Sequence, residues 1–254
     1  MTARSLRTLL AHLVDYAGLF PPAALTMQDA VRNYARYRES EFAWMLGSFV
    51  VPKERAKEVP AEFPMSVLGV HEIKANSVEE VNAIEGTGVE GTGVEGTGVY
   101  VEITDLSLLD AIANKGLRAK MRTGGLTEEA FPTSQKIADF LRACKARGVA
   151  FKATAGLHHP LRCVRSLTYE PNAPTGLMHG FINVFLAAAL LDDAEAVLEE
   201  RDAEAFAFDD DGARWRDRRV RTQDLEALRR DFAISFGSCS FEEPIDDLRA
   251  LHWL

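Results

Sequence analysis

The sequence predicts a single (β/α)8 barrel, because of its length, its alternating pattern and its lack of an internal linker. The chain has 254 residues, 47% of them hydrophobic, and barrels of about 250 residues are commonly one domain. Short apolar runs alternate with helical patterns, which is the order that a parallel barrel requires. No Pro-, Ser- or Gly-rich linker divides the chain in two, so we expect one domain over residues 1–254.

Eight strands are predicted, each followed by a helix or a short turn. The first and seventh strands are weak, so a doubly wound open α/β sheet is the alternative. Thr26 and Thr222 are expected to cap helices, and Pro244 to lie in a first turn. The expected strands span residues 12–17, 44–51, 65–70, 98–103, 117–122, 149–154, 204–209 and 232–237. The expected helices span residues 26–41, 77–84, 105–115, 129–147, 179–200, 222–230 and 243–252, with a short turn at 53–59.

Residues 85–99 read EGTGV three times in tandem, and we expect them to form a flexible loop within the domain. A period of five residues is too short for the unit of a solenoid. Lengthening a surface loop costs little, about 0.6 kcal/mol for each doubling. We therefore interpret the segment as a tolerated repeat expansion.

Charge and cysteine content narrow the classes of partner. The net charge is −9 and no sustained run of Lys or Arg occurs, which argues against nucleic acid or an anionic membrane as the main partner. No stretch of about 18 apolar residues predicts a membrane span. The three cysteines are widely spaced and odd in number, so neither a disulfide framework nor a zinc site is indicated. We expect a cytoplasmic protein that binds a small molecule; a homo-oligomer is compatible with the fold, although no segment identifies an interface.

Three consecutive strands, the fourth to the sixth, carry charged residues between apolar ones. The apolar set on each strand is expected to pack on the helices, which leaves the other set inside the barrel. By this alternation Glu102, Lys120, Arg122, Lys152 and Thr154 are expected to point inward. These positions lie near the carboxyl ends of the strands, where barrel enzymes have their active sites.

The inward charges suggest an anionic ligand. Neighbouring strands lie about 4.8 Å apart, so Glu102, Lys120 and Lys152 are expected to stand side by side, with Arg122 one layer above. Three cations against one anion is poor pairing for a purely structural ion network. We therefore expect a small anionic substrate.

Two adjacent lysines also predict a reactive amine. A second cation about 5 Å away destabilises the charged form of a lysine by about 3 kcal/mol at an effective dielectric of about 20. This repulsion would lower the pKa of that lysine by about 2. Lys120 is therefore expected to lower the pKa of Lys152, leaving a neutral amine that can form a Schiff base.

Three segments resemble a known family of enzymes. KMRTGG at 120–125 and FKATAGL at 151–157 resemble the two lysine strands of the deoxyribose-phosphate aldolase family. SFGSCSF at 235–241 is similar to the strand end that binds substrate phosphate in that family. The resemblance spans residues 98–241 and implies a class I aldolase.

The same resemblance implies roles for individual residues. Lys152 would form the Schiff base and Lys120 would lower its pKa. Glu102 would stand where the family has a catalytic Asp, and Gly237 and Ser238 would contact an anion.

Further polar residues follow the predicted strands. His158 lies on the loop after the sixth strand and is a candidate general acid or base. Asp15, at the end of the first strand, is a candidate for substrate binding, and the Phe-Pro-Pro segment at 20–22 would form a stiff apolar rim or a simple turn. His158, His179 and Glu102 could alternatively bind a divalent metal.

These observations favour a class I aldolase-like lyase that uses Lys152 on a small, anionic carbonyl substrate and needs no cofactor. Glu102 or His158 would move protons, while Arg122, Thr154 and Ser238 would bind substrate. A metal-dependent isomerase or hydrolase is the second hypothesis, and a non-catalytic small-molecule-binding barrel is the third.

Overall fold

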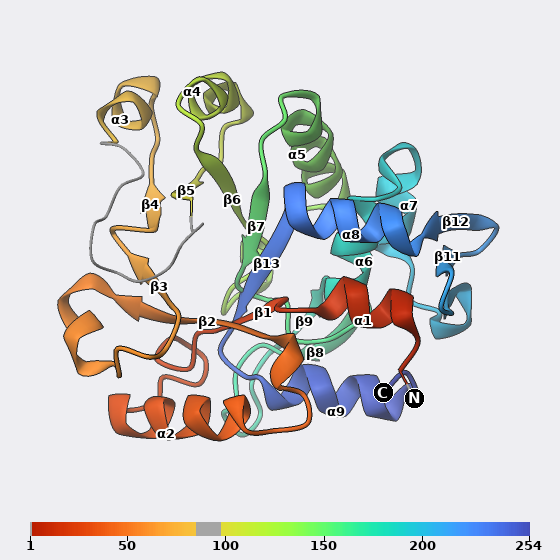
Figure 1. Cartoon of the computed structure of the whole chain (residues 1–254), viewed down its shortest axis with the longest axis horizontal. Helices are drawn as coiled ribbons and strands as arrows, with labels where there is room; N and C mark the ends of the chain where they lie inside the picture. Colours follow the sequence, from red (N-terminus) through yellow and green to blue (C-terminus); the bar gives the residue numbers. More distant parts are fainter. Residues whose placement is uncertain (1, 85–97) are drawn as a thin grey trace.

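A computed structural model describes residues 2–84 and 98–254 and contains a closed barrel of eight parallel strands (Figure 1). The predicted (β/α)8 class is confirmed, and the open-sheet alternative is wrong because the first and last strands pair with each other. Around the barrel the strand order is β1-β13-β7-β6-β5-β4-β3-β2. The strands are β1 (Val14–Tyr16), β2 (Leu46–Pro52), β3 (Met65–Leu68), β4 (Glu72–Lys74), β5 (Tyr100–Glu102), β6 (Arg118–Arg122), β7 (Phe151–Thr154) and β13 (Ala233–Ser238).

One barrel strand lies where none was predicted, and one predicted barrel strand lies outside the barrel. β4 has three residues, two of them charged, so no apolar run marks it in the sequence. It follows β3 after a tight turn with no helix between them. The predicted barrel strand at 204–209 was wrong, because that segment belongs to a separate antiparallel sheet of β10 (Phe206–Phe208), β11 (Gly212–Trp215) and β12 (Arg218–Arg221).

Helices cover the outside of the barrel, mostly where the periodicity predicted them (Figure 1). Thr26 caps its helix as expected, its hydroxyl accepting a hydrogen bond from the Asp29 amide. Thr222 does not, because Arg221 occupies the cap position and the Thr222 hydroxyl donates to the Asp210 carbonyl. The helices are α1 (Arg4–Leu10), α2 (Met27–Arg38), α3 (Val78–Ala83), α4 (Leu109–Asn114), α5 (Ser134–Ala146), α6 (Phe181–Ala187), α7 (Ala194–Glu199), α8 (Thr222–Asp231) and α9 (Glu242–Ala250).

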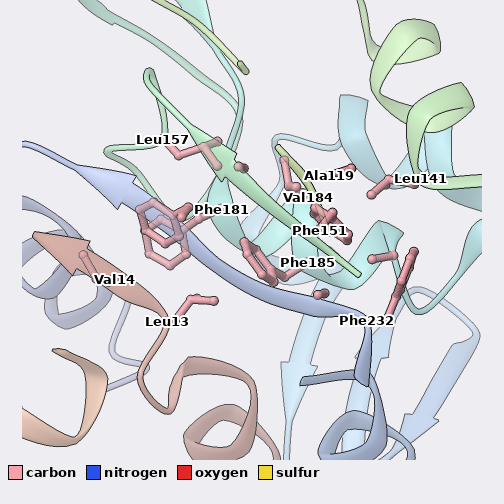
Figure 2. Packing of buried hydrophobic residues seen from close by; sticks show 14 of the residues in the cluster. Leu13, Val14, Ala119, Leu141, Phe151, Leu157, Phe181, Val184, Phe185 and Phe232 are labelled. Atoms are coloured by element: carbon pink, nitrogen blue, oxygen red, sulfur yellow. The ribbon is translucent and has the colours of Figure 1, made fainter. Parts of the chain in front are cut away.

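The core between β7, β13 and α6 is rich in aromatic side chains (Figure 2). The Phe151 ring lies 5.1 Å from that of Phe232 and 6.1 Å from that of Phe185, centroid to centroid. Each such ring contributes about 1.5–3 kcal/mol when it is buried. Every residue of α6 is buried, and the chain turns after it, so the single helix predicted for 179–200 is two helices.

Three further expectations concern the cysteines, a membrane span and the repeat loop. Cys144, Cys163 and Cys239 are free thiols, as their spacing indicated. Within the two described ranges, no helix has the length and apolar character needed to cross a bilayer. The predicted repeat loop at 85–99 lies outside the described residues except for its last two positions.

Candidate active site

A cavity of about 290 Å³ lies at the carboxyl-terminal mouth of the barrel. It is roughly twice the size of an engineered apolar cavity of about 150 Å³ that binds benzene, so it suits a small molecule. Its floor carries Glu72, Lys120 and Lys152, and Arg122 lines it nearer the mouth. Apolar side chains enclose the remainder, among them Phe20, Pro21, Pro22, Leu126, Leu167 and Met178.

The charged strand positions stand in the register that the alternation predicted. Glu102 is paired with Lys120 across β5 and β6, and Lys120 with Lys152 across β6 and β7. Arg122 is paired with Thr154 one layer nearer the mouth. The predicted placement of these five residues is confirmed, whereas their roles stay predictions.

Glu72 connects the two lysines. One of its carboxylate oxygens, Oε1, accepts a hydrogen bond from Lys152 Nζ at 2.6 Å, and the other, Oε2, lies 2.8 Å from Lys120 Nζ. Ser66 also donates to Oε1, at 2.6 Å. Lys120 Nζ lies 2.9 Å from Glu102 Oε2 as well, so carboxylates and ammonium groups alternate across the barrel.

Asp15 binds Lys152 from below. Its Oδ2 accepts hydrogen bonds from Lys152 Nζ and from the Ser235 hydroxyl, both at 2.6 Å, and its Oδ1 accepts one from the Ser48 amide at 2.8 Å. Asp15 is not among the described residues that line the mouth cavity, although it lines a second cavity of about 440 Å³ at the amino-terminal end of the barrel. The structure therefore places this predicted substrate contact beneath the lysine.

The prediction that cations outnumber anions inside the barrel was wrong. Asp15 and Glu72 join Glu102 as anions, so three carboxylates face the three cations Lys120, Arg122 and Lys152. The prediction overlooked Glu72, because no strand was assigned to its segment.

The expected low pKa of Lys152 was also wrong. Burial on its own lowers the pKa of Lys152, but the adjacent Asp15 and Glu72 carboxylates outweigh burial and raise it above the ordinary value. In the ligand-free cluster Lys152 is therefore an ammonium. The effect of Lys120 on Lys152 is offset because Glu72 lies between their charges.

The remaining predicted substrate contacts divide into exposed and buried ones. The Arg122 side chain is 52% exposed, and its Nε lies 3.6 Å from Glu102 Oε1, so much of the guanidinium faces the mouth. Thr154 and Gly237 are paired across β7 and β13, and both line the cavity. Ser238 is buried, accepts a hydrogen bond from the Ser240 amide at 3.3 Å, and is not among the described residues that line the cavity.

The alternative metal site is not assembled. His179 Nε2 bonds to the Pro132 carbonyl at 2.7 Å, and its Nδ1 lies 2.9 Å from Arg162, whereas Glu102 binds Lys120 and Arg122. In the part of the chain that the structure describes, no group of three or more His, Cys, Asp or Glu side chains is arranged to hold a metal ion. The set of His158, His179 and Glu102 is therefore corrected: these residues lie apart, each with other partners.

Two glycines allow the loops after β6 and β7 to meet at the mouth. A Cβ atom on Gly156 would lie 2.8 Å from the Gly124 Cα, closer than such atoms approach in proteins. Gly156 also has a φ of +76°, a conformation that glycine adopts without strain. This contact explains the glycines in the TGG and TAG segments that carry Thr123 and Thr154.

Some residues at the site carried no recognisable signal in the sequence. Glu72 lies in a strand too short to predict. Tyr169 and Glu243 meet next to His158, which lines the cavity, although they are 74 residues apart; their side chains are joined by a hydrogen bond of 2.8 Å. Only the fold brings such residues together, so their grouping could not be derived from local pattern.

Comparison of the chain with family models, with curated proteins and with solved structures found no match. Its function is therefore inferred from the chemistry of the cavity.

Proposed function

We propose that this protein is a Schiff-base carbon–carbon lyase that acts on a small anionic carbonyl compound, with Lys152 as the nucleophile and no cofactor. The observation that carries the proposal is the position of Lys152 in the floor of the mouth cavity. Its Nζ lies 2.6 Å from carboxylate oxygens of both Asp15 and Glu72. A lysine held between two bases beneath an apolar cavity suits covalent catalysis through an imine.

The chemistry begins with a proton transfer. Lys152 gives a proton to Asp15 or Glu72, and its neutral amine attacks the carbonyl carbon. The resulting carbinolamine takes that proton back from the carboxyl group and loses water to form a protonated imine. The imine accepts the electron pair of the bond between the α and β carbons as that bond breaks. The β-hydroxyl of the substrate gives its proton to His158, which lines the cavity, and the β-carbon fragment leaves as an aldehyde. The enamine then takes a proton, and water hydrolyses the imine to release the product and Lys152.

Arg122 suits the anionic group of the substrate. Its guanidinium is exposed at the cavity, and among the described residues it has one carboxylate contact, to Glu102 at 3.6 Å. A planar guanidinium binds carboxylate or phosphate through two parallel hydrogen bonds. Phe20, Pro21 and Pro22 line the same cavity and would keep bulk water from the imine.

The raised pKa of Lys152 sets the direction of the pH dependence. Because the ligand-free amine is protonated at neutral pH, imine formation is expected to accelerate as the pH rises toward the alkaline range. A rate of adduct formation that falls with rising pH would contradict this role of Lys152.

The test is reductive trapping with borohydride in the presence of acetaldehyde, propanal, acetone or pyruvate, measured by intact mass. We expect one adduct on the wild type and on Lys136→Met, which removes an exposed lysine, and no adduct on Lys152→Met. Lys120→Met tests the second floor lysine under the same conditions. A folded wild type that gives no adduct with any of the four compounds would overturn the proposal.

The non-catalytic binding barrel is favoured by a different observation, the pairing of the charges in the floor. Three cations and three carboxylates contact one another, which suits a preformed site that holds a ligand without reacting. That function predicts that Lys120→Met and Lys152→Met alter the affinity for small carboxylates in calorimetry, and that no carbonyl compound is ever trapped.

A further inference from the structure

Three segments that are distant in the sequence meet around His158, the one residue of the three that lines the cavity. His158 lines the cavity from the loop after β7. Glu243 lies in the first turn of α9, and Tyr169 lies in the connection between β8 (Cys163–Ser166) and β9 (Thr175–Met178). A single oxygen, Glu243 Oε2, lies 3.1 Å from His158 Nδ1 and accepts a hydrogen bond from the Tyr169 hydroxyl at 2.8 Å.

The hydrogen bonds determine which nitrogen of His158 is free to accept a proton. Burial on its own raises the pKa of Glu243, but the hydrogen bonds from His158 and Tyr169 help to bring it below the ordinary value, so the group is a carboxylate. Burial raises the pKa of Tyr169, which therefore keeps its proton and donates it to the carboxylate. An ionised carboxylate can only accept, so His158 Nδ1 must be the donor. In the neutral imidazole this leaves Nε2 unprotonated and able to take up a proton.

A neighbouring pair has the same chemistry but a different location. His159 Nδ1 lies 2.5 Å from Asp247 Oδ2, one turn further along α9. His159 is not among the described residues that line the cavity. Both pairs attach the loop after β7 to α9. Removing the second pair therefore shows what the loss of such a contact does to the structure alone.

We propose that His158 transfers the proton at the substrate carbon next to the imine, and that Glu243 and Tyr169 are positioning residues that hold its Nδ1 as the donor. This inference rests on the proposed Schiff-base function. The carbon atom next to the imine carbon loses a proton to His158 Nε2. The electron pair of that C–H bond forms the carbon–carbon double bond of the enamine. In the reverse direction His158 returns the proton to carbon, and its proton exchanges with water.

Glu102, the other residue expected to move protons, does not suit this step. Its Oε2 lies 2.9 Å from Lys120 Nζ and its Oε1 lies 3.6 Å from Arg122 Nε. It is also not among the described residues that line the cavity. Glu102 therefore holds the floor cations, and His158 faces the space in which the substrate reacts.

The experiment measures two steps of the same reaction separately. The wild type and variants are incubated in D₂O with whichever of acetaldehyde, propanal, acetone or pyruvate gives the borohydride adduct. Proton NMR follows exchange of hydrogen for deuterium next to the carbonyl, and intact mass follows the adduct. A general acid–base group contributes about 10²- to 10⁴-fold, so His158→Gln is expected to slow exchange by at least about 100-fold. The yield of adduct should stay within about twofold of the wild type.

Variants of the two carboxylates separate positioning from folding. Glu243→Gln is expected to slow exchange by about tenfold or more without lowering the yield of adduct, whereas Asp247→Asn leaves both unchanged. Nitrogen-15 spectra of histidine-labelled protein should show His158 as the Nδ1–H tautomer in the wild type, a measurement that needs no substrate.

The outcomes distinguish the two proposals. A trapped adduct whose exchange is equally fast in the wild type and in His158→Gln overturns this inference and leaves the Schiff base intact. An Nε2–H tautomer of His158, or an Asp247→Asn variant as slow as Glu243→Gln, also overturns it. The absence of any adduct on the folded wild type overturns the proposed function and this inference together.

Discussion

Glu72 holds the two buried lysines together, so its replacement gives the sharpest test of the charge network. Glu72→Gln keeps the shape of the side chain and removes the charge that Lys120 and Lys152 share. The two ammonium groups would then face each other across a neutral amide in the barrel interior. We expect a large loss in the free energy of unfolding.

The size of that loss can be worked out in two ways. Burial alone would raise the pKa of Glu72, but Lys152 and then Lys120 outweigh burial and lower it from the ordinary 4.5 to about 2. A difference of that size corresponds to about 3 kcal/mol of stability at neutral pH. Removing one partner of a buried ion pair costs about 3–5 kcal/mol in other proteins. We therefore expect Glu72→Gln to lower the free energy of unfolding by about 3–5 kcal/mol at pH 7.

The sign of the pH dependence follows from the lowered pKa. A carboxyl group with a lowered pKa in the folded state stabilises the protein above its ordinary pKa and loses that effect as the pH falls toward the folded value. The difference between the wild type and Glu72→Gln should therefore shrink as the pH is lowered from about 4.5 to about 2.

Urea denaturation followed by circular dichroism measures this difference at several pH values. Glu102→Gln is the matched control, because the Glu102 side chain is 16% exposed, against 3% for Glu72, and contacts only one of the two lysines. Its loss should be about 1 kcal/mol. A Glu72→Gln protein as stable as the wild type at pH 7, or a difference that does not change on acidification, would refute the reasoning.

Two further predictions concern stability. Burial lowers the pKa of His179 from 6.5 to about 4, so the neutral ring stabilises the fold above pH 6.5 and the effect is lost as the pH falls toward 4. When the pH is lowered from 6.5 to 4, the free energy of unfolding should therefore fall by about 3 kcal/mol less in His179→Gln than in the wild type. Urea denaturation at several pH values measures this difference. Gly156→Ala should lower the melting temperature more than Gly148→Ala, because both have positive φ but only a Cβ on Gly156 would meet other atoms, including Gly124. Equal melting temperatures of the two alanine variants would contradict this account.

The fold was largely predictable because short apolar runs alternate with helical patterns along the chain, and because apolar and polar residues alternate on the fourth, fifth and sixth predicted strands. The segment 149–154 is an example, since its apolar side chains alone determine which face packs on the helices. β4 could not be predicted in this way, because its three residues, Glu72–Lys74, are too few to show an apolar pattern. The segment 204–209 was predicted as a weak strand and does contain β10, but it lies outside the barrel, because local pattern specifies a strand and not the sheet that it joins.

Only the part of the candidate site that lies on neighbouring strands could be predicted from the sequence. Glu102, Lys120 and Lys152 were placed correctly, because their register follows from alternation on three consecutive strands. The ionisation of Lys152 was not predicted correctly, because it depends on Asp15 and Glu72, which approach from strands elsewhere in the barrel. Contacts across a closed barrel depend on its shear, which no single strand encodes.

The central claim is that Lys152, and not another amine, carries the Schiff base. Peptide mapping of the borohydride-reduced protein tests it most directly, since it identifies the modified lysine. We predict that the adduct lies in the peptide containing Lys152 and that its yield rises with pH. An adduct confined to Lys120 or to surface lysines, or the absence of any adduct in the folded protein, would contradict the account.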